Sequence, residues 1–123
     1  MRSRAPLTLA AAAFVAAALT ACGAPAPLPT PPPGALVITA QGTAFVSGPY
    51  TAPADVAFTL FLENHDNEPH NVRIWNAAGA SVFPGEIIQG PAAKAEEVPA
   101  LPAGTYRITC DIHPEMTAEL TVQ

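Results

Sequence analysis

The chain has 123 residues and no visible internal repeat, so its length is that of one domain. Ten acidic residues outnumber five basic ones, and the formal net charge is −5. Because proteins bind phosphate backbones through basic patches, this balance argues against nucleic acid as a partner, whereas it suits simple solubility or a basic protein partner.

The first segment has the composition of a secretory signal. Arg2 and Arg4 precede an apolar run over residues 7–19 that consists almost wholly of Ala, Leu, Val and Phe. A membrane-spanning helix needs about 20 apolar residues, so this run is too short to cross a bilayer. It is typical of a segment that directs export.

The signal ends in LTAC, residues 19–22, which has the form of a bacterial lipobox. We therefore expect residues 1–21 to be a lipoprotein signal peptide and Cys22 to carry lipid. The protein would then be extracytoplasmic, in the periplasm or at the cell surface, and anchored to a membrane surface. The alternative is an ordinary cleavage site that happens to include Cys22. Without residues 1–21, three basic residues remain against ten acids, which makes the formal charge −7.

A proline-rich stretch follows the lipobox. Residues 23–34 read GAPAPLPTPPPG and hold six of the fifteen prolines in the chain. Such a segment favours the extended polyproline conformation, which rises about 3.1 Å per residue and reaches roughly 35 Å here. We expect residues 22–34 to be a lipidated stalk and residues 35–123 to be the folded domain.

Residues 35–123 have the pattern of an all-β domain. Short β-rich runs alternate with Gly, Pro and Asn, and no helical period is evident. In residues 55–64 Val56, Phe58, Leu60 and Leu62 alternate onto one face. About eight short strands at this spacing favour a Greek-key β-sandwich. The expected strands are 36–40, 43–46, 55–64, 71–75, 81–83, 93–98, 105–110 and 118–122.

The last two of these strands flank the motif CDIHPEM, residues 110–116. If Cys22 is lipidated, Cys110 is an unpaired thiol in a compartment where thiols tend to oxidise. It is either a buried inert residue, half of a disulfide with Cys22, or a metal ligand. Cys110, His113 and Met116 together offer a thiolate, an imidazole and a thioether, a set that suits copper in both of its common oxidation states.

One further ligand is needed, and the chain has three histidines. His70 precedes the NVRIW strand and is the best candidate. His65 lies in the polar run NHDNE, where a solvated loop residue is the expected role.

Together these motifs resemble a known family. PHNV at residues 69–72, followed by GTYRITCDIHPEM at residues 104–116, is similar to the type 1 (blue) copper proteins, or cupredoxins, and most like the amicyanin branch of the plastocyanin-like group. The resemblance covers most of residues 36–122. This chain differs from many relatives in having Thr117 and Ala118 after Met116, where a basic residue and Gly are frequent, which bears on the geometry of the turn.

The resemblance implies a cupredoxin-like sandwich that binds one type 1 copper per chain. Its equatorial ligands would be His70, Cys110 and His113, and its axial ligand Met116. It also implies that Asn71 lies behind the ligands and that its side chain bonds near Asp111, tying the two ligand loops together.

The function implied is one-electron transfer between redox proteins, without conversion of a substrate. Partners would dock transiently near His113, with Pro114 and Pro69 beside it. Nothing in the sequence argues against a monomer, which is the expected state. Multicopper enzymes need more histidines, and a dinuclear copper centre needs two cysteines in the loop. The alternative function is copper capture or delivery. Zinc at these ligands would be misloading, because copper binds such ligands more tightly, and a metal-free adhesion domain would leave the motif without a purpose.

Overall fold

The computed structural model describes residues 23–123; residues 1–22, among them the expected lipidation site Cys22, lie outside the described part. All regular structure in the described part is β-strand, so the expected all-β class is confirmed. No helix there is long and apolar enough to cross a membrane. The strands are β1 (Leu36–Ala40), β2 (Phe45–Val46), β3 (Tyr50–Ala52), β4 (Phe58–Asn64), β5 (Pro69–His70), β6 (Arg73–Trp75), β7 (Ser81–Phe83), β8 (Ile88–Gln89), β9 (Ala92–Val98), β10 (Gly104–Thr109) and β11 (Thr117–Val122).

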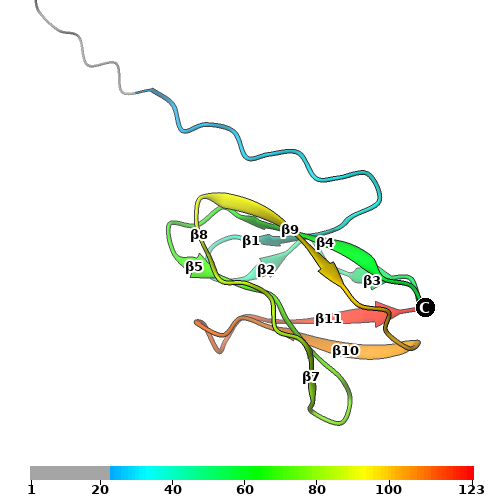
Figure 1. The fold of residues 1–123 in the computed structure, drawn as a ribbon. Coiled ribbons are helices and arrows are strands. Elements are labelled where there is room, and N and C mark those ends of the chain that lie inside the picture. The colour runs from blue at the N-terminus through cyan, green and yellow to red at the C-terminus, as the bar shows by residue number, and fades with distance from the viewer. Residues whose placement is uncertain (1–22) are drawn as a thin grey trace, which may run out of the picture.

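Two sheets face each other to form a sandwich (Figure 1). One has the strand order β2-β1-β4-β9, and the other has the order β3-β11-β10-β6-β7. The pairs β1–β4 and β3–β11 are parallel, and the remaining pairs are antiparallel. The short strands β5 and β8 pair only with each other, and they close one end of the sandwich.

The core lies between the sheets and follows the alternation of the strands. Successive side chains of a strand point to opposite faces, so every second residue faces the core, and in β4 Phe61 is buried as well. Phe58, Leu60 and Leu62 of β4 are buried in this way, and Tyr106 and Ile108 of β10 face them from the other sheet. Cys110 continues the β10 series and is also buried.

The predicted extent of the β4 strand is wrong at its start. Val56 was expected on the same face as Phe58, but it is 56% exposed. The strand begins only at Phe58, and Asp55 has a φ of 59°, a left-handed conformation that turns the chain before the strand.

The sandwich brings the segments of interest to one end. β10 stops at Thr109, directly before Cys110, and β11 starts at Thr117, directly after Met116. His70 ends β5 and pairs in register with Ile88 of β8. In Figure 1 the β5–β8 pair and the loop between β10 and β11 lie at the same end of the molecule.

Candidate metal centre

Three side chains from two segments, the end of β5 and the loop between β10 and β11, converge at this end. The ligand atoms of His70, Cys110 and His113 lie within 4.8 Å of one another. Cys110 Sγ is 3.7 Å from His70 Nδ1 and 3.9 Å from His113 Nδ1. The two imidazole rings are tilted by 53°, with their centroids 4.7 Å apart. In the described part of the chain this is the one group of such side chains that could hold a metal ion, and its three residues are among those expected from the sequence.

The spacing of these atoms fits a shared metal ion. Bonds of about 2.0 Å to nitrogen and about 2.3 Å to sulfur, as zinc forms, separate N and S by about 3.7 Å when the angle between them is trigonal. The observed sulfur–nitrogen distances of 3.7 and 3.9 Å match this value.

The loop between β10 and β11 is held closed by its own backbone. Met116 N donates to His113 O at 2.9 Å, and Cys110 N donates to Met116 O at 3.2 Å. Met116 is buried in the core. These bonds hold three of the four expected ligands in one short turn, and Thr117 and Ala118 follow directly in β11.

His70 is fully buried and bonded on its far side. Its Nε2 lies 2.9 Å from Asp66 Oδ2. The same carboxylate accepts hydrogen bonds from Gly42 N at 2.7 Å and Thr43 N at 3.1 Å. Burial on its own raises the pKa of Asp66, but the bonds from the Thr43 and Gly42 amides and from His70 outweigh burial and hold the pKa below its ordinary value.

Asn71 and Asp111 join the two segments that carry the donors. Asn71 Nδ2 donates to Asp111 Oδ2 at 2.9 Å and to Pro84 O at 3.1 Å. Asp111 N donates to Asn71 Oδ1 at 2.8 Å. Arg73 Nε and Nη2 each donate to Asp111 at 2.7 Å, and this contact, more than the opposing effect of burial, lowers the pKa of Asp111.

One of the candidate metal ligands, His113, lies close to the surface. His113 is half-buried, whereas His70 and Cys110 are buried, and its neighbours Ile112 and Pro114 are exposed. His65 lies outside the cluster: it is exposed, with Nε2 3.4 Å from Glu63. Glu115 is exposed in the loop.

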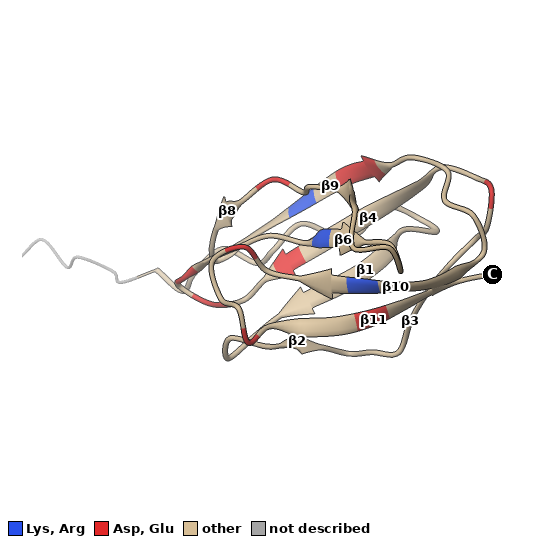
Figure 2. Cartoon of the chain, turned by 90° about the horizontal axis from the view of Figure 1, so that it is seen from below, with Lys and Arg blue, Asp and Glu red and all other residues tan. Residues whose placement is uncertain are grey.

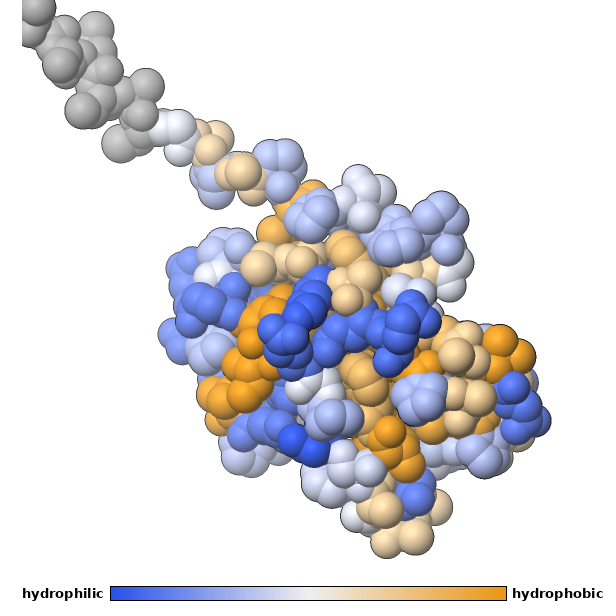
Figure 3. Space-filling model, viewed as in Figure 1, coloured by the Kyte–Doolittle hydropathy of each residue, from blue (hydrophilic) through white to orange (hydrophobic). Residues whose placement is uncertain are grey.

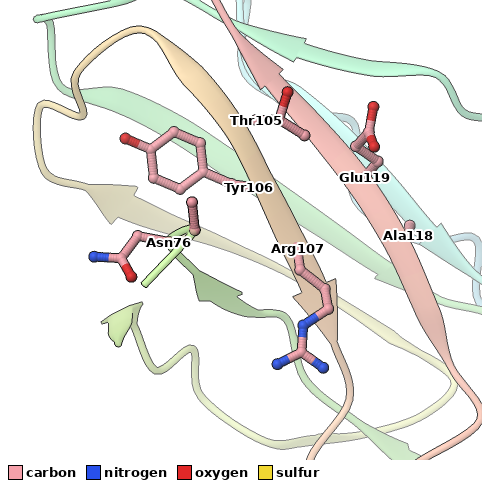
Figure 4. Close-up of a pocket in the computed structure, with 7 residues that line it drawn as sticks. Asn76, Thr105, Tyr106, Arg107, Ala118 and Glu119 are labelled. Atoms are coloured by element: carbon pink, nitrogen blue, oxygen red, sulfur yellow. The ribbon is translucent and has the colours of Figure 1, made fainter. Parts of the chain in front are cut away.

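A separate hollow lies on the outer surface of the β10–β11 sheet (Figure 4). Asn76, Thr105, Arg107 and Glu119 are among its lining residues, and no member of the donor cluster is. It therefore does not provide access to the candidate metal centre.

Sequence reasoning missed Asp66. The residue lies in the polar run NHDNE and four residues before His70, but in an extended chain this spacing does not predict contact. The contact arises because the turn between β1 and β2 holds the carboxylate, and that turn is distant in sequence.

The model of the cupredoxin-like domain family matches residues 9–122. This match begins inside the segment expected to be a signal peptide. No curated protein matches the chain in sequence.

Solved structures share the fold. Amicyanin from Paracoccus versutus (Thiobacillus versutus) aligns with a TM-score of 0.56 and 23% identity, over 75% of this chain and 84% of that chain. Dithionite-reduced auracyanin from the photosynthetic bacterium Roseiflexus castenholzii aligns with a TM-score of 0.59 and 18% identity, over 73% of this chain and 97% of that chain. At these identities the likeness concerns the fold.

Proposed function

The chain belongs to the cupredoxin-like domain family, and from this premise we propose that it is a lipid-anchored, extracytoplasmic blue copper protein that carries single electrons between redox partners. The observation that carries the proposal is the convergence of His70, Cys110 and His113, whose ligand atoms lie within 4.8 Å of one another. Membership of the family alone would not show that this chain has side chains placed to bind a metal.

The donor set fits copper. A thiolate and two imidazoles suit both Cu(I) and Cu(II), and a weak thioether completes the set that is typical of electron-transfer copper sites. His70, Cys110 and His113 would hold the metal, with Met116 as the weak fourth donor and one copper per chain. When bound, copper would supply a centre that takes up and releases one electron.

The protein residues keep the donors in place. His70 is bonded to Asp66, Cys110 is tied to Met116 through the backbone, and Asn71 joins the two segments through Asp111. Donors held from outside in this way move little when the charge at the centre changes, and a small rearrangement favours fast electron transfer. Burial of His70 and Cys110 also keeps water away from the donors.

The partner surface would surround His113. Ile112 in the same loop and Ile87 just before β8 are 43% and 47% exposed. Figure 3 shows hydrophobic atoms at the left end of the molecule, where Figure 1 places β5, β8 and the β10–β11 loop. A small apolar surface of this kind, with Pro114 and Pro69 nearby, suits the brief encounters of redox proteins. We expect the protein to be a monomer between these encounters.

Charge would select the partner. Acidic residues lie in several loops at the end that carries β8 (Figure 2). The basic residues Arg73, Lys94 and Arg107 lie on strands β6, β9 and β10. A redox partner with basic groups around its docking surface would therefore approach this end favourably.

The location rests on the sequence. Lipid on Cys22 would anchor the chain to a membrane, residues 22–34 would act as a spacer, and residues 35–123 would form the copper-binding domain. The spacer suits an electron carrier because it lets the donor-bearing end meet partners away from the lipid.

Copper capture or delivery is the competing role. Such a role needs a site that exchanges its metal readily, whereas three of the four expected ligands, His70, Cys110 and Met116, are buried. No enzymatic conversion of a substrate is proposed.

The two roles are separated by repeated redox cycling of the full chain loaded with Cu(II). An electron carrier takes up one electron per copper, returns it to an oxidant, and keeps its metal through many cycles in the presence of a competing chelator. Loss of copper to the chelator on each reduction would support delivery and contradict the electron-carrier proposal.

A further inference from the structure

We propose that Asp66 is a positioning residue that holds His70 in the tautomer with the proton on Nε2 and turns Nδ1 toward Cys110. The inference rests on the proposed function for the identity of the metal, but the tautomer itself is a property of the metal-free chain. Asp66 contacts His70 directly, whereas Asn71 and Asp111, the supporting residues expected from the sequence, bond to each other and join the two loops.

The Asp66 carboxylate accepts hydrogen bonds from two backbone amides as well as facing His70. Oδ1 accepts from Gly42 N at 2.7 Å, and Oδ2 accepts from Thr43 N at 3.1 Å. His70 Nε2 then approaches Oδ2 at 2.9 Å. Two backbone amides therefore fix the orientation of the carboxylate before the histidine meets it.

The turn that supplies these amides is itself unusual. Gly42 and Thr43 have φ values of 62° and 54°, two successive left-handed conformations that point both N–H groups toward Asp66. For Thr43 this conformation is costly, by about 1–2 kcal/mol for a residue with a side chain. A carboxylate that accepts both N–H groups offsets this cost, as in other anion-binding turns.

The buried side chain of Asn64 holds the loop that carries Asp66. Asn64 is fully buried, and its Oδ1 accepts from Asp66 N at 3.0 Å. Its Nδ2 donates to Glu68 O at 2.8 Å and to Ile88 O at 3.2 Å. Asp66 is thus held on both its backbone and its side chain, so it can position another residue.

The carboxylate of Asp66 determines which ring nitrogen of His70 carries the proton. An ionised carboxylate has no donor, so a hydrogen bond between Asp66 Oδ2 and His70 Nε2 requires the proton on Nε2. A neutral imidazole with its proton on Nε2 carries a lone pair on Nδ1. That nitrogen lies 3.7 Å from Cys110 Sγ. His70 would therefore present a donor atom to the metal before the metal binds, as carboxylate–histidine pairs do at other metal sites.

The negative charge of Asp66 adds a second effect. A carboxylate behind the ligand raises the basicity of the imidazole and favours the more positive metal. Removal of this charge should weaken Cu(II) binding more than Cu(I) binding, and the reduction potential should rise.

The test compares Asp66→Ala and Asp66→Leu with Glu68→Gln in the full chain. Asp66→Leu keeps the approximate size of the side chain but has no acceptor for His70 Nε2, so it serves if Asp66→Ala does not fold. Glu68→Gln removes the same charge two residues from His70, on an exposed side chain. Nitrogen NMR of the metal-free protein, at a pH above the ordinary titration range of histidine, reports which ring nitrogen of His70 bears the proton.

The expected result is the Nε2–H form in the unsubstituted chain and in Glu68→Gln, and a shift toward the Nδ1–H form in both Asp66 variants. Titration with Cu(I) alone against a competing chelator should show an affinity about 10- to 100-fold lower for the Asp66 variants. A proton on Nδ1 in the unsubstituted chain, or a tautomer unchanged by both substitutions, would overturn the inference. If the tautomers behave as expected but the unsubstituted chain binds no copper, the inference about Asp66 stands and the proposed function fails.

Discussion

Asn71 and Asp111 are joined by two hydrogen bonds that run in opposite directions. Asn71 Nδ2 donates to Asp111 Oδ2 at 2.9 Å, and Asp111 N donates to Asn71 Oδ1 at 2.8 Å. The bonds connect the segment of His70 with the segment of Cys110, forty positions apart in sequence. These hydrogen bonds therefore help to hold the segment that carries His70 beside the segment that carries Cys110.

Replacement of Asn71 by Ala should destabilise the metal-free protein. It removes the donor to Pro84 O and leaves Asp111 N without its acceptor, and a buried group that loses its partner costs about 1–3 kcal/mol. Urea unfolding measures the change in the free energy of unfolding. Asn67→Ala is the control, since Asn67 is exposed in the turn before β5. Equal losses in the two variants would contradict a joining role for Asn71.

The ion pair between Arg73 and Asp111 should make part of the stability depend on pH. The contact with Arg73 lowers the pKa of Asp111 in the folded protein, so its contribution is complete above the ordinary pKa of about 3.9 and is lost as the pH falls through the lower folded value. Arg73→Gln should cost up to about 1 kcal/mol near neutral pH, because the pair is partly exposed.

The pH-dependent part of this difference should shrink below the ordinary pKa of Asp, as measured by urea unfolding of the metal-free protein over an acidic pH series. A difference between Arg73→Gln and the unsubstituted chain that stays constant over the series would assign the effect to packing against Trp75 instead, whose ring centroid lies 5.5 Å from the Arg73 guanidinium.

Gly85 should not tolerate a side chain. It has a φ of 57°, and a Cβ there would overlap the backbone oxygen of Val72. Gly85→Ala should lower the free energy of unfolding by more than the 1–2 kcal/mol that a left-handed conformation alone costs. Gly79→Ala is the matched control, because Gly79 has a φ of 80° and open space around its Cβ position. Thermal unfolding should show the larger loss for Gly85→Ala; the same loss in both would mean that the loop at Gly85 moves aside.

Ile112 should matter for the exchange of electrons and not for the centre itself. Ile112→Ser removes an exposed apolar contact beside His113. Electron self-exchange between reduced and oxidised copies, followed by NMR line broadening, should slow about tenfold for a loss of about 1.4 kcal/mol of contact energy. Val56→Ser is the control, since Val56 is also an exposed apolar residue but lies before the start of β4, whereas the end of β4 leads to His70. The reduction potential should stay unchanged in both variants, and equal rates in both would place the docking surface elsewhere.

Much of the fold was predictable because the long strands alternate. β1, β4, β9, β10 and β11 lie within two or three residues of the expected ranges, and the buried faces of β4 and β10 follow the expected period. The short strands β3, β5 and β8 were missed. Strands of two or three residues beside Pro or Gly show no measurable period, and their pairing is decided by the neighbouring strands.

The grouping of the candidate ligand residues and the family were predictable for a different reason. Cys110, His113 and Met116 share one short loop, so their proximity follows from the chain itself. His70 was the best candidate among the three histidines, and the resemblance to the cupredoxins implied the same residue. The match of the cupredoxin-like family model confirms that resemblance. Asp66 was not predictable, since its contact with His70 depends on the turn at Gly42 and Thr43, more than twenty residues away.

The most direct test of the central claim is the visible absorption spectrum of the full chain after addition of Cu(II), recorded beside the Cys110→Ser variant. A blue copper centre predicts an intense thiolate-to-copper charge-transfer band that disappears when a reductant is added and is absent in Cys110→Ser. A folded chain that binds copper and stays colourless, or that binds none, would contradict the electron-carrier account.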